Sequence, residues 1–324
     1  PSAVDGFTVQ AFVDQSDREW AIANIDRITY DLSADYFTQR IDGHSILVGG
    51  GYRLNDDTLV SGVSNRVSVD PRARQEEVFN LFLQDEITLV PDRLTLTLGS
   101  KFEYNDFAGW ETQPNVRLMF KQSTNLSWWG SVSRAVRTPG RADRDYQFIF
   151  DVFPPASPGL PPLAPTASGT RNFDSEVLLA YEFGIKAKPH SGLALDFSSF
   201  YFEYDDTRSY RIGGSRCLPS NLPPPECLTD PATFAIATDA FQANAAHAES
   251  YGVEASFDWR PNTSWRVQGN ASVFNGEETG DGQPGFVTTD SLQTSPDFQA
   301  SLRVGYLPAR KWELDLWVRY VDDI

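Results

Sequence analysis

The sequence predicts an all-β protein that crosses a membrane as an antiparallel up-and-down β-barrel. Three observations support this fold class. Apolar and polar residues alternate over stretches of about ten residues, large aromatic residues gather at the ends of many of those stretches, and short turns alternate with long loops. These features are typical of transmembrane barrels, because lipid-facing and lumen-facing residues alternate along strands of about 9–11 residues.

The clearest alternation runs from Arg93 to Tyr104. One face carries Leu94, Leu96, Leu98, Phe102 and Tyr104, and the other carries Thr95, Thr97, Gly99, Lys101 and Glu103. A slip of one residue would exchange the two faces, so the register is well specified. The same pattern, with Trp317 the exception in the last strand, predicts thirteen strands near residues 7–14, 28–40, 44–54, 76–90, 93–104, 114–122, 125–135, 175–188, 193–206, 250–260, 265–275, 296–307 and 312–322.

The connections between these strands alternate in length. Short turns are predicted at 42–43, 91–92, 123–124, 189–192, 261–264 and 308–311, and long loops near 15–27, 55–75, 105–113, 136–174, 207–249 and 276–295. Bacterial outer-membrane barrels place short turns on one rim and long loops on the other, and they close with an even number of strands. Thirteen is odd, and unpaired strand edges cannot face lipid, so we expect an incomplete barrel.

Composition narrows the function classes. The chain has 44 acidic and 27 basic residues and a formal net charge of −17, which argues against nucleic acid as a partner, because phosphate binding needs a basic face. No stretch approaches eighteen apolar residues, which excludes a transmembrane helix. His44, His190 and His247 are scattered and no nucleophile has a companion base, so we expect no catalytic, cofactor or metal site.

Cys217 and Cys227 are the only cysteines, and they flank a proline-rich segment. Two cysteines in this setting favour a disulfide formed in an oxidising compartment. A metal-binding pair is the lesser alternative, since no further cysteine or clustered histidine completes a ligand set.

The stretch Gln84–Asp106 resembles the β-barrel of TonB-dependent outer-membrane receptors. Further segments that resemble the family follow in family order: Ser133–Pro139, Ser175-Glu176 with Tyr181–Gly184, Phe200–Asp206, Tyr251–Glu254, Ser295-Pro296 and Trp312–Asp315. No single motif is decisive, but the ordered series is specific, and the resemblance covers roughly residues 25 to 324.

The resemblance implies part of a barrel of about 22 strands in the outer membrane of a Gram-negative bacterium. Residues 1–324 are expected to be a partial barrel domain in which the plug domain and the TonB box are absent. The family imports scarce nutrients, above all ferric siderophores, and TonB energises the import. We therefore expect TonB, a ferric siderophore, lipid and lipopolysaccharide as partners of a monomeric, non-enzymatic receptor. Two alternatives are a passive porin-like channel and, less well supported, a soluble glycan-binding β protein.

The segment Ser133–Tyr146 carries four arginines where a predicted strand meets Pro139-Gly140. Strand parity places Arg134 on the outer surface, where it could bind lipopolysaccharide phosphate. The candidate ligand residues of the mouth are Arg137, Arg141, Arg144 and Tyr146. The alternative is that the arginines pair with Asp143, Asp145 and Asp151 and shape the loop.

Overall fold

The structure is a computed structural model that describes residues 5–323, except 65, 156, 158, 227–229, 231–232, 281, 283, 290 and 310–311. These residues form a 17-stranded sheet. Each of the thirteen predicted strands is present, as β1 (Asp5–Glu19), β2 (Ala23–Thr38), β3 (His44–Ser61), β5 (Ala73–Val90), β6 (Leu94–Asn105), β7 (Gly109–Ser123), β8 (Leu126–Arg137), β11 (Glu176–His190), β12 (Leu193–Leu218), β13 (Ala235–Asn262), β14 (Trp265–Gly280), β16 (Phe298–Ala309) and β17 (Trp312–Val321). The all-β prediction is confirmed.

The remaining elements lie in the long connections. They are the short strands β4 (Val67–Val69), β9 (Tyr146–Ile149), β10 (Leu163–Ser168) and β15 (Phe286–Thr288), the single-turn helix α1 (Arg141–Arg144) and the 3₁₀ turn η1 (Ser291–Thr294). Within the described residues, no helix has the length and apolar content that a membrane crossing would need.

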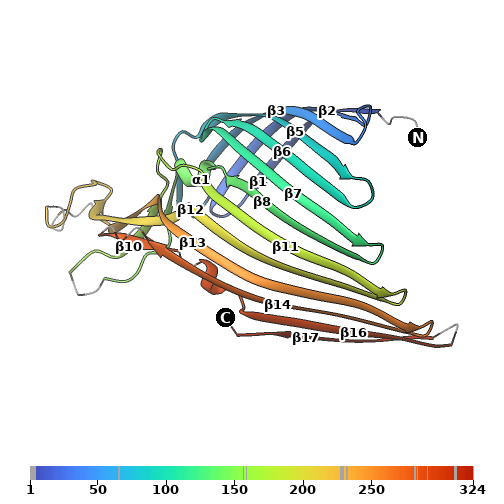
Figure 1. Cartoon of the computed structure of the whole chain (residues 1–324). Coiled ribbons are helices and arrows are strands. Elements are labelled where there is room, and N and C mark those ends of the chain that lie inside the picture. Colours follow the sequence, from blue (N-terminus) through green and yellow to red (C-terminus); the bar gives the residue numbers. More distant parts are fainter. Residues whose placement is uncertain are drawn as a thin grey trace.

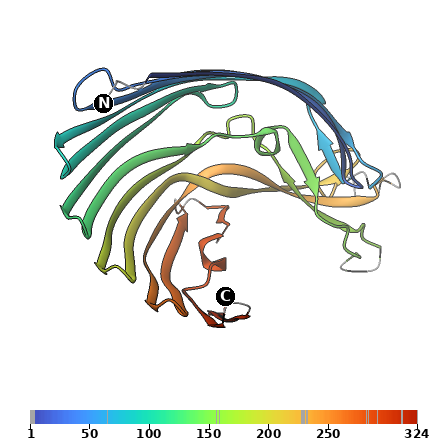
Figure 2. The same ribbon diagram turned by 90° about the vertical axis from the view of Figure 1, so that its right-hand side faces the viewer.

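The thirteen long strands pair in sequence order, each antiparallel to the next, and the sheet curves into an open trough (Figures 1 and 2). The short turns gather at one end of the trough, and α1 and β10 lie at the other end (Figure 1). The strands β1 and β17 lie on opposite sides of the opening (Figure 2). The sheet is therefore an up-and-down barrel wall that does not close.

Turn residues at the short-turn end have the backbone conformations that tight hairpins require. Gly43 has a φ of 78° and Asp92 a φ of 60°. This left-handed region is open to glycine at no steric cost, and aspartate and asparagine tolerate it better than most other residues. The Asp42-Gly43 and Pro91-Asp92 turns were predicted from these residue types, and the structure confirms both.

Strand pairing keeps the two faces of the sheet continuous from strand to strand. On the outer face, Val132 pairs with Val116 on one side and Tyr181 on the other. On the luminal face, the neighbouring Ser131 pairs with Arg117 and Glu182. The irregular Trp317 pairs with Arg303 and so belongs to the luminal face, which explains why it breaks the apolar pattern of its strand.

The long-loop end differs from the prediction in two ways. The loops expected at 15–27 and 105–113 shrink to residues 20–22 and 106–108, and the loop expected at 207–249 is largely strand, because β12 and β13 continue far beyond the predicted ends. Residues outside the membrane still form backbone hydrogen bonds between strands. The strands therefore extend beyond the residues that show the apolar alternation. In addition, β10 pairs with β13 in parallel, which departs from a purely antiparallel sheet.

An aromatic group lies on the luminal face around Gly252. Phe200 stacks on Phe202 with ring centroids 4.7 Å apart and lies 6.4 Å from Phe274. Gly252 pairs with both Phe200 and Phe274 across the sheet. A Cβ atom at this position would collide with the Val273 carbonyl oxygen and with the Phe200 ring. The absence of a side chain therefore lets the two rings meet over the glycine.

We expect Gly252→Ala to destabilise the protein by about 1–3 kcal/mol, because overpacking forces the backbone and the Phe200 ring to shift. The temperature at which the full-length protein loses its heat-modifiable gel migration measures this effect. Gly130→Ala is the matched control on β8, since the nearest atom to its added Cβ would be 3.6 Å away. Equal melting of the two variants would contradict the packing argument.

Candidate functional site

The candidate mouth begins where β8 ends. Pro139 has no backbone N–H and lies two residues after Arg137, the last residue of the strand, so the ladder cannot continue through it. The chain turns into α1, where the Asp143 carboxylate accepts a hydrogen bond of 2.9 Å from the Gly140 backbone N–H. This local cap fixes the single helical turn and so sets the direction of Arg141, Asp143 and Asp145.

Arg141 anchors this turn to the barrel wall. Its guanidinium pairs with Asp57 of β3 and, at 3.0 Å, with Asp145, and it donates to the carbonyl oxygens of Pro71 and Arg72. The Arg141 side chain is 5% exposed, and those of Asp57 and Asp145 are 3% and 2% exposed. The Arg141 guanidinium is thus engaged on all sides by partners within the protein.

The two carboxylates that hold Arg141 have second arginine partners on neighbouring strands. Asp57 lies 3.0 Å from Arg27 of β2, and Asp145 lies 3.1 Å from Arg74 of β5. Hydrogen-bonded pairing of this kind offsets the cost of burying charged groups. The network joins α1 to three consecutive strands of the wall.

Asp143 forms a second anchor. It pairs with Arg208 of β12 and lies 3.6 Å from Arg137 at the end of β8. Arg137 also lies 3.2 Å from Glu176 of β11, and the two residues are partners in strand register. Glu176 continues the luminal face that carries Glu182, so Arg137 lies on the luminal side, and its side chain is 44% exposed.

Arg144 lies beside a second arginine on the ring of Phe107. The guanidinium carbon of Arg74 lies 4.2 Å from the ring centroid and that of Arg144 lies 5.6 Å away. Arg144 also donates a hydrogen bond to the Phe107 carbonyl oxygen. Burial lowers the pKa of Arg144, and the neighbouring Arg74 charge lowers it further, while Asp145 and Asp174 oppose the change.

Tyr146 begins β9 and packs against a small hydrophobic cluster. The buried members are Leu59, Val67 and Val69, and Tyr146 and Phe148 pack against them with ring centroids 5.6 Å apart. Burial is the main cause that raises the pKa of Tyr146. The cluster fixes the strand that follows α1 against the top of β3.

The arginine on the outer surface also has a protein partner. Arg134 pairs in register with the outer-face residue Leu179, in agreement with the predicted parity. Its guanidinium lies 3.2 Å from Glu111 and 2.5 Å from the Thr112 carbonyl oxygen. A lipopolysaccharide contact by Arg134 stays a prediction, as do the ligand roles of Arg137, Arg141, Arg144 and Tyr146.

The predicted disulfide lies at the tip of the β12–β13 hairpin. Cys217 is fully buried and disulfide-bonded. Its predicted partner Cys227 lies outside the described residues. Nearby, Asp239 of β13 accepts hydrogen bonds from Arg216 and, at 2.5 Å, from Thr166 of β10. This contact ties β10 to the hairpin.

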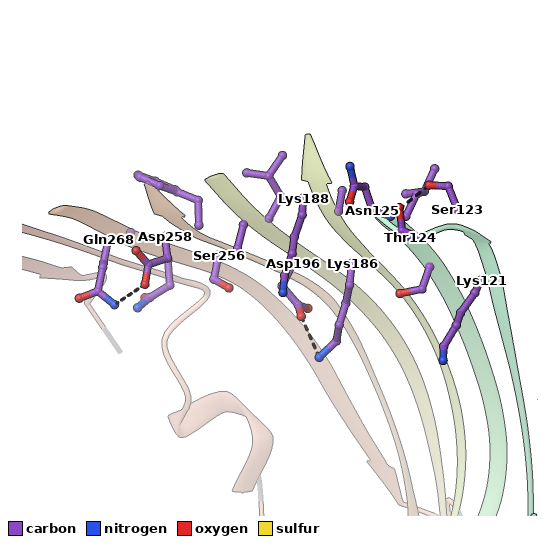
Figure 3. A pocket seen from close by; sticks show the side chains of 18 of the residues that line it. Lys121, Ser123, Thr124, Asn125, Lys186, Lys188, Asp196, Ser256, Asp258 and Gln268 are labelled. Carbon is purple, nitrogen blue, oxygen red and sulfur yellow. Dashed lines mark hydrogen bonds and ion pairs between the residues drawn. The ribbon is translucent and has the colours of Figure 1, made fainter. Parts of the chain in front are cut away.

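A large hollow lies on the luminal face at the short-turn end. It has a volume of about 1230 Å³, and its polar lining includes Lys121, Lys186, Lys188, Asp196 and Asp258. Lys186 and Asp196 point toward each other (Figure 3), and the Lys186 Nζ lies 3.0 Å from the Asp196 Oδ2. Lys186 and Asp258 belong to the polar faces of strands that the sequence predicted. No three His, Cys, Asp or Glu side chains of the described residues gather into a group that could hold a metal ion.

Sequence reasoning missed several partners of the mouth. Asp57, Arg74, Phe107 and Arg208 all lie far in sequence from α1 and carry no motif. Arg74 and Asp57 could have been paired from the β3–β5 register, in which they are partners. The contacts of α1 with either strand depend on how the long loop folds back.

No curated protein sequence matches the chain. The chain resembles a ferric enterobactin receptor (PfeA) variant from Pseudomonas aeruginosa in complex with enterobactin (15% identity, TM-score 0.67, 98% of this chain and 50% of that chain). It also resembles the siderophore receptor PirA of the same species, at 14% identity and a TM-score of 0.62 over 99% of this chain and 57% of that chain. The FrpB iron transporter of Neisseria meningitidis is similar at 11% identity and a TM-score of 0.66 over 97% of this chain and 47% of that chain.

The chain spans about half the length of these solved structures, and at such low identity the likeness establishes the fold. A family model described as "TonB dependent receptor-like, beta-barrel" matches residues 3–323. That match covers nearly the whole chain and agrees with the open up-and-down sheet. The chain is an outer-membrane β-barrel segment, and it belongs to the TonB-dependent receptor family.

Proposed function

We propose that this chain is part of the barrel of a receptor that imports a ferric siderophore across the outer membrane. The observation that carries the proposal is the family match over residues 3–323, together with structural neighbours named as ferric enterobactin, siderophore and iron receptors. The mouth is consistent with an anionic iron chelate. Arg137 faces the lumen with a side chain that is 44% exposed, and a guanidinium attracts and orients oxyanions.

The proposed receptor binds and gates, and it makes or breaks no covalent bond. By family resemblance, a plug domain would block the lumen and TonB would move it. We propose the same partners for the complete protein, which would act as a monomer in contact with lipid and lipopolysaccharide. The loop held by Arg141 would form a fixed part of the entrance.

Uptake of radioactive iron as ferric enterobactin tests the proposal in cells that carry the full-length protein as their only candidate receptor. We expect uptake that requires TonB and that stops when the gene is deleted. Free iron that enters equally well would contradict import of a siderophore complex, and ferric enterobactin that fails to bind would exclude enterobactin as the siderophore. Passive conductance in planar bilayers, together with uptake that does not need TonB, would instead support the porin-like alternative.

We expect Arg137→Gln to weaken binding of ferric enterobactin about tenfold, the loss of one charge-assisted contact worth about 1.4 kcal/mol. Arg66→Gln is the control, because Arg66 lies in another loop at the same end and pairs with Asp151 on the surface. Affinity that is unchanged in Arg137→Gln would remove Arg137 from the ligand site. A direct binding titration in detergent measures both variants.

A further inference from the structure

A small cavity lies at the long-loop end, next to the anchored turn. It has a volume of about 390 Å³, and its lining is Asp70, Pro71, Arg74, Arg144, Asp145 and Arg171. Ligand pockets commonly have volumes of about 300–1,000 Å³. The cavity is thus large enough for a small charged group with a few water molecules.

Three arginines and two aspartates line this cavity, but the aspartates do not cancel the positive charge. The side chain of Asp145 is 2% exposed, and its oxygens accept hydrogen bonds from Arg74 and Arg141. Asp70 is 90% exposed and contacts Arg171 at 3.5 Å. The inner wall of the cavity therefore presents mainly guanidinium groups.

Arg144 is the least compensated of the three. Among the described residues, no carboxylate lies within 4.0 Å of its guanidinium, and its hydrogen-bond partner is the neutral carbonyl of Phe107. Asp174 and Asp145 act on it only from a longer distance. Two guanidinium groups on one buried aromatic ring repel each other, and an anion between them would relieve that repulsion.

We propose that this cavity is an oxyanion-binding site in which Arg74, Arg144 and Arg171 hold a phosphate or carboxylate group. Guanidinium offers paired N–H donors in a planar fork that matches both groups. Burial and Arg74 lower the pKa of Arg144 despite the opposing charges of Asp145 and Asp174, which agrees with a cation that no carboxylate contacts directly. This site goes beyond the proposed import, because its anion binding does not depend on which nutrient the barrel carries.

Titration of the full-length protein in detergent with inorganic phosphate and with citrate tests the site by calorimetry. We expect saturable binding to the unmodified protein and at least tenfold weaker binding to Arg144→Gln. Arg171→Gln provides a second variant that should fold normally, because its side chain is 79% exposed, and we expect binding several-fold weaker. Arg144→Lys keeps the positive charge but loses the paired N–H donors of guanidinium. Its anion affinity should lie between that of Arg144→Gln and that of the unmodified protein.

Arg66→Gln is the matched control, with the same loss of charge at the same end of the barrel, and its affinity should be unchanged. Absence of saturable binding to the unmodified protein would overturn the proposal. An equal loss in Arg66→Gln would also overturn it, since the attraction would then be a general effect of charge. Either result would leave TonB-dependent uptake of ferric enterobactin intact, so the two proposals fail separately.

Two sources could supply such a group at the outer rim, and the same variants distinguish them. Purified protein that retains lipopolysaccharide, and loses it in Arg144→Gln and Arg171→Gln, identifies lipid phosphate as the occupant. Protein free of lipopolysaccharide that binds phosphate or citrate identifies a soluble anion. Both results support an oxyanion site.

Discussion

Replacing Arg141 by alanine is expected to lower the free energy of unfolding by about 3 kcal/mol and to release the loop that follows β8. Removal of one partner from a buried ion pair typically costs about 3–5 kcal/mol. The lower end applies here, because Asp57 keeps Arg27 and Asp145 keeps Arg74 as partners. The midpoint of urea unfolding of the full-length protein in vesicles measures the loss, and limited proteolysis between residues 138 and 175 reports the release.

Arg66→Ala is the control for this experiment. Arg66 pairs with Asp151 at 2.9 Å, but the two side chains are 47% and 54% exposed. An exposed pair contributes at most about 1 kcal/mol, so the control should unfold almost like the unmodified protein. If Arg141→Ala matched the control in both stability and protease resistance, Arg141 would not be an anchor.

Replacing Val132 by arginine is expected to cost about 2–4 kcal/mol, whereas the same replacement one residue earlier, Ser131→Arg, should cost less than about 1 kcal/mol. Val132 lies on the outer face and is 44% exposed, so the new charge would enter lipid. Ser131 lies on the luminal face and donates a hydrogen bond of 3.0 Å to Glu182, which would pair with the new guanidinium.

The two neighbouring substitutions introduce the same residue in the same strand at nearly the same depth. A difference in their stability therefore reports which face of the sheet contacts lipid. Folding yield into lipid vesicles and the urea midpoint measure the difference. Equal losses for Val132→Arg and Ser131→Arg would contradict the assignment of outer and luminal faces. A larger loss for Ser131→Arg would reverse it.

The wall of the barrel was predictable because its strands and turns are specified by short local sequence patterns. Each crossing needs alternate apolar residues, and each tight turn needs residues such as Gly43 or Asp92 that tolerate a positive φ. All thirteen long strands were therefore found from periodicity. Trp317, which breaks the apolar–polar alternation of its strand, lies on the luminal face beside Arg303.

The long-loop end was not predictable in the same way. Strand ends beyond the membrane carry no lipid-facing pattern, so β12 and β13 were predicted too short. In the candidate mouth, the strand register places Arg134 opposite Leu179 and Arg137 opposite Glu176, as parity predicts. The pairing of Arg141 with Asp145 agrees with the loop-shaping alternative, but its contact with Asp57, 84 positions away, depends on how the loop folds back.

The β12–β13 hairpin projects far beyond the membrane-spanning part of the wall. These strands have 26 and 28 residues, whereas a crossing uses about 9–11 residues, so more than half of each strand projects beyond the lipid. The short strand β10 pairs with β13 in this projecting part, and Thr166 of β10 donates a hydrogen bond to Asp239 of β13. The outer part of the hairpin is therefore three strands wide. The β12–β13 ladder changes register between Tyr204 and Arg208 and again between Ile212 and Ser215, and β-bulges bend the strands that carry them. The projecting part of the hairpin therefore leaves the wall above Gly252 at its own angle.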